Sequence, residues 1–317
     1  MNINRCPGCL EPENNTYCKK CIKKLFNGKK VSHILNFDRP EFGASISGIH
    51  IKHSLKLENN NLILTEKKGE YILKPIPSGQ FQNLDQLPAN EHLTMQIAKR
   101  VYKINTADNA VIFFSDGEIA YITKRFDILP NGHKLLQEDF AQISERTEET
   151  HGRNYKYDFS YEEIAALIKK YVKAYAVEIE SWFRVLIFNY LFSNSDAHLK
   201  NFSLYRNVVY GDYMLTPYYD LLNTSLHVPG EKDMALGLFK DGFETEQFRA
   251  GSKHTKADLI EFADRIGINK IRFNKIYNKM LNGSAEVEKL ISYSFIKEFL
   301  KTRYLNNYFQ RLARLKS

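Results

Sequence analysis

The chain has 317 residues, 43% of them hydrophobic, and a formal net charge of +8. The sequence holds no low-complexity segment, no apolar signal-peptide core and no run long enough to span a membrane, which argues against disordered, secreted and membrane-spanning classes. The length suits two lobes with a small appendage, and the positive charge favours acidic partners without identifying one.

All four cysteines lie near the start, as Cys6-Pro7-Gly8-Cys9 and Cys18-Lys19-Lys20-Cys21. Two such Cys-x2-Cys pairs can place four thiolates around Zn²⁺, and a four-cysteine site is closed and structural. Disulfides would require an oxidising compartment. We therefore expect a compact zinc knuckle within a segment spanning residues 1–38. Six lysines between residues 19 and 30 leave two roles open: nucleic-acid binding, or a solvated basic face on a structural cap.

Residues 39–127 are predicted to form a β-rich lobe. A turn of small residues at 43–49 leads into an alternating stretch at 49–55 that is typical of a strand. The asparagine run at 59–61 then indicates a hairpin.

The next apolar strand, at residues 70–75, carries Lys74 at its end. A helix is predicted to follow at Pro88-Ala89-Asn90-Glu91, with Asn90 as its cap, because apolar residues recur downstream at helical spacing. Glu91 would either stabilise the helix dipole or form an ion pair with Lys74.

A second hairpin is predicted around the Asp116-Gly117 turn, with residues 118–127 as its outgoing strand. The remainder, residues 128–317, is predicted to be helical. Ser160 and Glu163 have the spacing of a capping box, and residues 180–192 are apolar on almost every side, as expected of a buried helix. Residues 144–158 lack periodicity and fit either a mobile substrate-facing loop or a solvated connection.

The most informative segment follows that buried helix. Residues 194–201 read Asn-Ser-Asp-Ala-His-Leu-Lys-Asn, and Tyr219-Asp220-Leu221 comes shortly after. Phosphoryl transfer needs a carboxylate to orient the attacking hydroxyl, which suits Asp196, and hard oxygen ligands for Mg²⁺, which suit Asn201 and Asp220. Lys200 would stabilise charge on the transferring group, and His198 is expected to hold the shape of the loop.

The order of these features resembles the HipA-like serine/threonine kinases, the toxins of bacterial toxin–antitoxin modules. The resemblance implies a bilobal α+β kinase fold with a β-rich N-lobe and an all-helical C-lobe, ATP and Mg²⁺ as cofactors, and phosphorylation of a bacterial protein such as an aminoacyl-tRNA synthetase. The segments that carry it are Ser45-Ile46-Ser47-Gly48, Tyr71-Ile72-Leu73-Lys74, Asn90-Glu91-His92, Lys124-Arg125-Phe126-Asp127, Gln137-Glu138-Asp139-Phe140, residues 194–203 and Tyr219-Asp220-Leu221-Leu222.

The resemblance also implies which residues meet the nucleotide. Phosphates would lie under the loop of small residues and against the lysine, which pairs with the helix glutamate, and the adenine would meet the strand at residues 124–126. The ATP-binding residues implied are Ser45, Ile46, Ser47, Gly48, Lys74, Glu91, Lys124 and Phe126. Family members autophosphorylate serines of this loop, here Ser45 and Ser47, and the added negative charge would repel the nucleotide and switch the enzyme off.

The chain is similar to the short, HipT-type form, because its small-residue loop begins near residue 43 and leaves no room for an additional N-terminal subdomain. That form implies two partners, a small HipS-like protein and a HipB-like helix-turn-helix antitoxin. DNA would be met only through the antitoxin. We expect a cytoplasmic bacterial protein without membrane contact, with delivery to another cell left open. The alternatives are a pseudokinase, a zinc-dependent nucleic-acid-binding module and a small-molecule kinase of the same fold.

Overall fold

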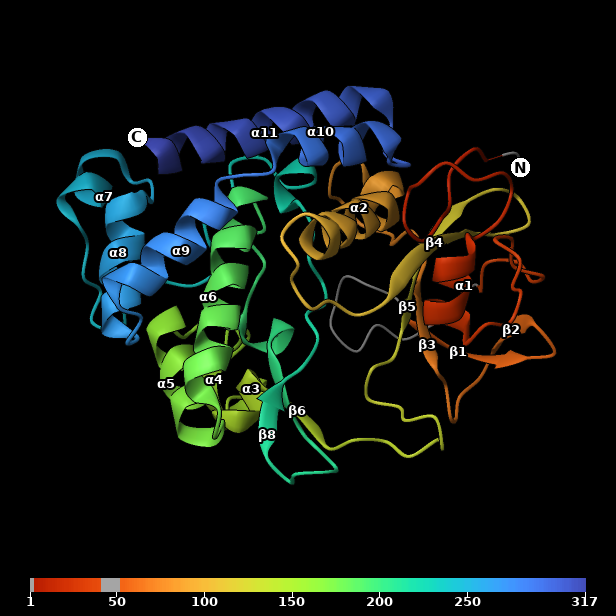
Figure 1. Cartoon of the computed structure of the whole chain (residues 1–317), viewed down its shortest axis with the longest axis horizontal. Coiled ribbons are helices and arrows are strands. Elements are labelled where there is room, and N and C mark those ends of the chain that lie inside the picture. Colours follow the sequence, from red (N-terminus) through yellow and green to blue (C-terminus); the bar gives the residue numbers. More distant parts are fainter. Residues whose placement is uncertain (1–2, 41–51) are drawn as a thin grey trace.

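A computed structural model describes residues 3–40 and 52–317. A β-sheet region with α1 occupies one end of the molecule and a helical region the other, with α2 between them and α10 and α11 along one side (Figure 1). The predicted phosphate loop, Ser45, Ile46, Ser47 and Gly48, lies outside the described residues.

The larger sheet has five antiparallel strands in the order β2-β1-β3-β5-β4. Asn59 and Asn60 join the first two strands with positive φ angles of 48° and 65°, which confirms the predicted hairpin. The first strand begins at His53 and runs on to Glu58, so its described part extends beyond the predicted end at residue 55. The strands are β1 (His53–Glu58), β2 (Asn61–Leu64), β3 (Tyr71–Lys74), β4 (Asn109–Phe113) and β5 (Ile119–Lys124).

The N-terminal segment packs against this sheet and does not stand apart from it. Helix α1 (Lys19–Phe26) buries Cys21, Leu25 and Phe26, which join the hydrophobic cluster formed by the sheet's own buried residues. The edge strand β4 is also covered, since the Phe113 N–H donates to His33 O at 2.9 Å. The segment therefore completes the core of the sheet region and protects its edge.

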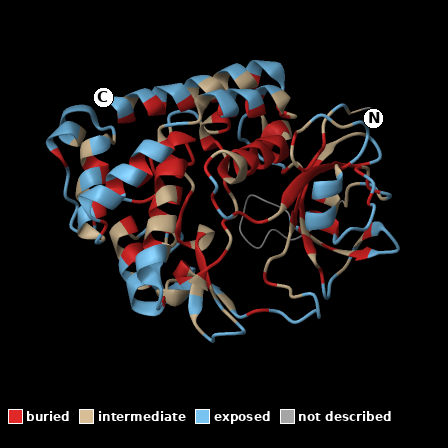
Figure 2. Cartoon of the chain, viewed as in Figure 1, coloured by how far each residue is buried: buried red, intermediate tan, exposed pale blue. Residues whose placement is uncertain are grey.

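Helix α2 (Leu87–Arg100) begins four residues before Glu91, after Gln86, so the predicted cap at Asn90 is wrong. Asn90 lies fully buried in the first turns, where its Nδ2 donates to Asn223 O at 2.8 Å and its Oδ1 accepts from the Asn223 N–H at 3.1 Å. The Asn90 side chain therefore bonds the distant backbone of Asn223 and does not cap the helix. Residues 87–98 are all buried, as the red of α2 in Figure 2 shows.

The helical region is built around α6 (Tyr175–Leu191), which carries the buried Trp182 and Phe188. This helix starts five residues before the predicted buried helix at 180–192 and ends one residue before its predicted end. The predicted capping box is present: Ser160 Oγ accepts from the Glu163 N–H at 3.2 Å at the start of α5 (Tyr161–Tyr171). The other helices of this region are α3 (Phe140–Ile143), α4 (Glu148–His151), α7 (Glu246–Gly251), α8 (Lys256–Arg265), α9 (Lys270–Met280), α10 (Ser284–Tyr293) and α11 (Glu298–Lys316).

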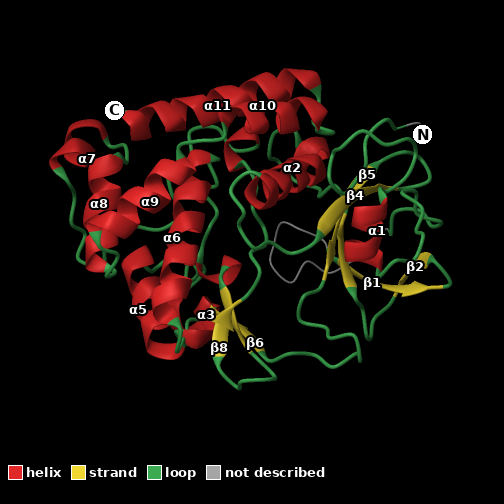
Figure 3. Ribbon diagram, viewed as in Figure 1, coloured by secondary structure: helices red, strands yellow, loops and turns green. Residues whose placement is uncertain are grey.

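A second, three-stranded sheet lies at the edge of the helical region, in the order β6-β7-β8 (Figure 3). Its strands are β6 (Gln137–Asp139), β7 (Ser203–Arg206) and β8 (Tyr213–Leu215). Residues 128–317 are mainly helical, as predicted, but the prediction of an all-helical C-lobe did not include this sheet. The strands β7 and β8 connect the segment at 194–201 to Asp220. Within the described ranges, no helix combines the length and the apolar character that crossing a bilayer requires.

Candidate active site

Lys74 lies at the centre of a buried charge cluster. Its Nζ donates to Glu91 Oε1 at 2.7 Å, and it also donates to Asp220 Oδ1. Lys74 and Glu91 are only 5% and 2% exposed. Burial alone would lower the pKa of Lys74, but the charges of Asp220 and Glu91 outweigh burial and raise it above its usual range. The amine therefore stays charged and joins β3, α2 and the segment after β8.

Asp220 has a constrained backbone. Its φ is +54°, in the left-handed region that non-glycine residues adopt at a cost of about 1 kcal/mol. Lys52 Nζ lies 3.8 Å from Asp220 Oδ2, which gives this carboxylate a second cationic neighbour. Strain held by surrounding contacts is common at functional sites, and here it accompanies a carboxylate that meets two lysines.

The loop at residues 194–201 is fixed at both ends. At its start, Asn194 Nδ2 donates to Asn189 Oδ1 of α6 at 3.0 Å, and the Ser195 N–H donates to Thr224 Oγ1 at 2.9 Å. At its end, Asn201 Oδ1 accepts from the His198 N–H at 3.1 Å. The buried helix thus delivers a rigid loop, and an amide oxygen and a carboxylate from Asn201 and Asp220 are ligand types that fit Mg²⁺.

Asp196 projects from this loop and is only partly covered. The hydroxyl of Tyr157 donates a hydrogen bond to Asp196 Oδ1, and the His198 Nε2 lies 3.9 Å from the same oxygen. The Tyr157 ring meets the His198 ring edge-on, with centroids 5.1 Å apart. Burial lowers the pKa of His198 to about 4, so the imidazole is neutral near pH 7. His198 therefore packs beside Asp196 without adding a charge, which fits the structural role expected of it.

The other predicted site residues that the structure describes have different neighbours. Lys200 Nζ is 3.5 Å from the Tyr155 hydroxyl. Phe126 stacks on Tyr219, with ring centroids 5.9 Å apart, next to Asp220. The Lys124 amine donates to Asn27 Oδ1 at 2.6 Å, and its backbone N–H donates to Asp108 O at 2.8 Å. Both donors of Lys124 are thus engaged within the chain, and its contact with a nucleotide stays a prediction.

Two residues of the site were not predicted. Tyr157 comes from the stretch at 144–158, whose lack of periodicity left its direction open. Glu231 lies half-buried after Asp220, with its Oε2 against Thr224 Oγ1. Burial, and then the nearby charge of Asp196, raise the pKa of Glu231 to about 7. A strand-end lysine or a spaced Asp and Asn can be recognised from sequence, whereas these two depend on long-range folding.

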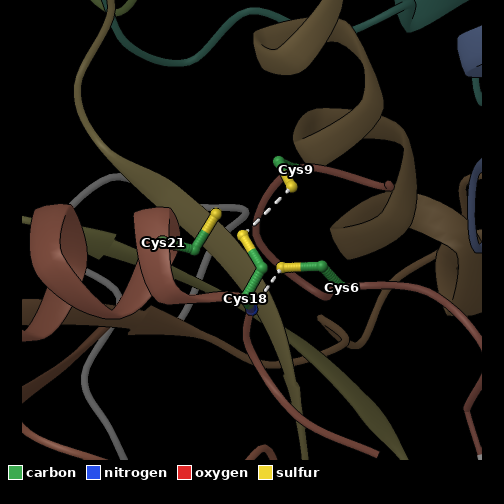
Figure 4. Close-up of side chains that lie close together, drawn as sticks. All are labelled: Cys6, Cys9, Cys18 and Cys21. Carbon is green, nitrogen blue, oxygen red and sulfur yellow. Dashed lines mark hydrogen bonds between the residues drawn. The ribbon is translucent and has the colours of Figure 1, made fainter. Parts of the chain in front are cut away.

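The four cysteines form a second candidate centre (Figure 4). The sulfur atoms of Cys6, Cys9, Cys18 and Cys21 all lie within 4.8 Å of one another. Cys9 Sγ and Cys18 Sγ are 3.7 Å apart, close to the roughly 3.8 Å that four thiolates at about 2.3 Å from a tetrahedral Zn²⁺ would adopt. The Cys18 N–H also points at Cys6 Sγ, at 3.2 Å. The donor set and its spacing fit a structural zinc ion.

Gly8 permits this close packing. A Cβ placed on Gly8 would lie 2.8 Å from Cys21 Sγ and 3.0 Å from Cys21 Cβ, closer than side chains tolerate. The small residue inside the first Cys-x2-Cys pair therefore lets α1 bring Cys21 against the other thiols.

Sequence comparison places this chain among kinase-like proteins. The profile of the HipA-like C-terminal domain matches residues 44–287. A Haemophilus influenzae protein named "Putative kinase" is 28% identical over 326 residues, covering 94% of this chain and 92% of that protein. The serine/threonine-protein kinase toxin HipA of Shewanella oneidensis is 24% identical over 71% of this chain, which spans 52% of the toxin's length.

Comparison with solved structures establishes the fold. A Shewanella oneidensis HipA, solved with HipB and its operator DNA, superposes with a TM-score of 0.64 at 20% identity, over 88% of this chain and 66% of that one. The Helicobacter pylori proinflammatory kinase CtkA superposes with a TM-score of 0.53 at 12% identity, over 87% of this chain and 95% of that one. The predicted α+β fold, with a β-rich N-terminal part and a helical C-terminal part, is confirmed.

Proposed function

The chain belongs to the HipA-like C-terminal domain family, and from that premise we propose that it is an ATP- and Mg²⁺-dependent serine/threonine protein kinase. The observation that carries the proposal is the convergence on Lys74 of Glu91 and Asp220, which come from separate parts of the sequence. A lysine paired with a helix glutamate, beside a metal-binding aspartate, is the arrangement that protein kinases use to hold nucleotide phosphates.

The remaining site residues have roles that follow from their chemistry. Bound Mg²⁺-ATP supplies the phosphoryl group. Lys74 contacts the phosphates, and Asn201 and Asp220 hold the metal with oxygen ligands. Asp196 accepts a hydrogen bond from the acceptor hydroxyl and orients it for attack. Lys200 follows in the same loop and balances negative charge at the reacting centre.

Further residues are proposed to bind the nucleotide. Ser45, Ile46, Ser47 and Gly48, which are outside the described residues, would hold its phosphates, and Lys124 to Phe126 would bind its adenine. Ser45 and Ser47 are autophosphorylation sites, and phosphorylation opposes nucleotide binding because it adds about two negative charges where the phosphates must bind. Mass spectrometry of the purified chain after incubation with ATP tests this: a loop that stays unmodified in the active protein would contradict it.

We place the kinase in a toxin–antitoxin system of the short HipT type. Support for the association comes from the likeness of this chain's fold to a HipA that was solved with HipB and its operator DNA. The partners are then a HipS-like small protein and a HipB-like antitoxin, with DNA reached through the antitoxin. The substrate is a translation protein such as an aminoacyl-tRNA synthetase. We further propose that the four-cysteine cluster, whose sulfur atoms lie within 4.8 Å of one another, binds a structural Zn²⁺ ion.

Labelling of a bacterial lysate tests the kinase assignment. The purified chain with radiolabelled ATP and Mg²⁺ should label a discrete acceptor protein on serine or threonine, and Asp196→Asn should not. A label found only on small molecules would favour a small-molecule kinase, and nucleotide binding without transfer would favour a pseudokinase. Either result would contradict the proposal.

A further inference from the structure

Two neighbouring residues of α2 have different partners. Glu91 pairs with Lys74, whereas the next residue, His92, has its Nε2 3.2 Å from Gly8 O. His92 is fully buried, and burial lowers its pKa to about 4, so the neutral ring donates from Nε2 to that carbonyl. Gly8 lies between Cys6 and Cys9. The helix that supplies the glutamate of the active site is thus bonded directly to the cysteine cluster.

A second pair of contacts joins the cluster to the same helix. The Arg100 guanidinium, in the last turn of α2, donates to Cys9 O and to the Glu11 carboxylate. Leu10, between them, is fully buried and belongs to the large hydrophobic core of the helical region. The first Cys-x2-Cys pair is therefore held along α2 at two positions, His92 and Arg100, more than two turns apart.

The other side of the cluster is bonded to the sheet. The Tyr71 hydroxyl, on β3 and three residues before Lys74, donates to Leu25 O of α1 at 2.8 Å. On β4, the Val111 N–H donates to Pro7 O at 3.0 Å, and Val111 O accepts from the Tyr17 hydroxyl at 2.9 Å. The segment that carries the cysteines thus contacts both the strand of Lys74 and the helix of Glu91.

We propose that the four-cysteine segment, with Zn²⁺ bound, is a brace that fixes α2 against β3 and so sets the position of Glu91 relative to Lys74. His92 is then a positioning residue for phosphoryl transfer, acting through Glu91. The effect on phosphoryl transfer rests on the proposed kinase function, whereas the brace itself is a property of the fold.

The metal matters because it would tie the two Cys-x2-Cys loops directly to each other, in addition to the contacts that each makes with the sheet and with α2. Residues 6–9 and 18–21 are joined by a short connection, and their thiols lie within 4.8 Å of one another. Without a metal, the crowded thiols have no covalent tie, whereas bound Zn²⁺ converts ligand binding into folding free energy. Loss of the ion should loosen the carbonyls of Gly8 and Cys9, to which α2 is bonded.

Hydrogen exchange tests the brace without relying on catalysis. The full chain is compared with zinc loaded and with zinc removed by a thiol-reactive agent and a chelator, with zinc content measured in both. We expect the amides of α2 and β4 to exchange at least tenfold faster after removal, while those of α6 in the helical core are unchanged. Unchanged protection of α2, or an equal loss in α6, would overturn the brace.

Substitutions of His92 give the second test, read as the affinity for a fluorescent ATP analogue. His92→Leu removes the donor to Gly8 O, and we expect affinity to fall roughly three- to tenfold while zinc stays bound. His92→Gln retains a donor and should restore affinity to within about twofold. Thr94→Val is the matched control on the same helix: it removes the hydrogen bonds of Thr94 to Asn90 O and to Tyr304 of α11, and it should leave affinity unchanged.

Equal losses in the leucine, glutamine and valine variants, or no loss in the leucine variant, would contradict the role of His92. Failure of the kinase assignment can be told apart from failure of the brace. The first would appear as absent phosphate transfer in wild type, whereas hydrogen exchange decides whether the brace exists.

Discussion

Lys74 Nζ contacts the carboxylate of Asp220, a residue 146 positions later in the chain, and at the same time pairs with Glu91. Lys74→Met should therefore reduce phosphoryl transfer by about 10²- to 10³-fold, because the phosphates lose their cation. It should also lower the melting temperature, since a buried carboxylate is left unpaired. Rates of transfer and thermal melts check both effects.

Lys52→Met is the control for Lys74→Met. Lys52 is more exposed, and its Nζ lies 3.8 Å from Asp220 Oδ2. Its loss should change the rate by no more than about threefold, as is usual for exposed ion pairs. Equal losses in the two variants would contradict a special role for Lys74.

Tyr157 donates its hydroxyl hydrogen to Asp196 Oδ1, the oxygen that an acceptor hydroxyl would use. An incoming protein substrate must then displace it. Tyr157→Phe should lower the KM for the protein acceptor by about three- to tenfold, because one hydrogen bond to a charged group is no longer broken. Steady-state kinetics on the labelled acceptor measures the change.

Tyr155→Phe provides a matched comparison from the same loop, because the Tyr155 hydroxyl accepts from Lys200 Nζ at 3.5 Å, whereas Asp196 is bonded by Tyr157. Its KM should stay within twofold of wild type. A KM that rises in Tyr157→Phe would mean that this hydroxyl assists catalysis and does not compete with the acceptor.

Glu231 should give the stability a specific pH dependence. Burial and the charge of Asp196 raise its pKa from 4.5 to about 7, so the folded protein binds this proton more tightly than the unfolded chain does. The resulting stability is full below pH 4.5 and is lost as the pH rises to about 7. Protonated Glu231 can donate to Thr224 Oγ1, which leaves the Thr224 hydroxyl hydrogen for Ser193 O at 2.9 Å.

Glu231→Gln imitates the protonated form. It should be more stable than wild type at pH 8 by about 1 kcal/mol, since solvent screens a half-buried group, and equal to wild type below pH 4.5. Urea unfolding at both pH values measures this, with the exposed Glu149→Gln as the control. If the variant and wild type differed by the same free energy of unfolding at both pH values, Glu231 would be excluded as the source of the pH dependence.

Gly8→Ala should weaken the zinc site without touching a thiol. The added Cβ would lie 2.8 Å from Cys21 Sγ, so the ligand must shift. We expect at least a tenfold loss of zinc affinity, measured by competition with a chromogenic chelator. Gly251→Ala, where a Cβ meets nothing within 4 Å, is the glycine control and should retain full affinity.

Local spacing explains which parts could be predicted from the sequence. The two Cys-x2-Cys pairs, the strand ending in Lys74 and the Asp196 to Asn201 spacing are features of short segments. The structure brings the four thiols together and ends β3 at Lys74, as expected. The capping box at Ser160 is equally local.

Long-range contacts explain what could not be predicted. Asn90 has the character of a cap, but its amide bonds Asn223, which is 133 residues away. The N-terminal segment has the sequence of an appendage, but the Tyr17 and Tyr71 hydroxyls bond it to the sheet, and only the folded chain reveals those partners. Tyr157 reaches Asp196 in the same way.

The central claim is that Lys74, Asp196, Asn201 and Asp220 together hold Mg²⁺-ATP and an acceptor hydroxyl. The most direct measurement is the rate of phosphate transfer from labelled ATP to the acceptor, with increasing Mg²⁺, for wild type and for Asp220→Asn. We predict saturable, Mg²⁺-dependent transfer in wild type and a loss of at least 10²-fold in the variant, whose melting temperature stays near that of wild type. Transfer by Asp220→Asn at the wild-type rate and the same Mg²⁺ dependence would contradict the account.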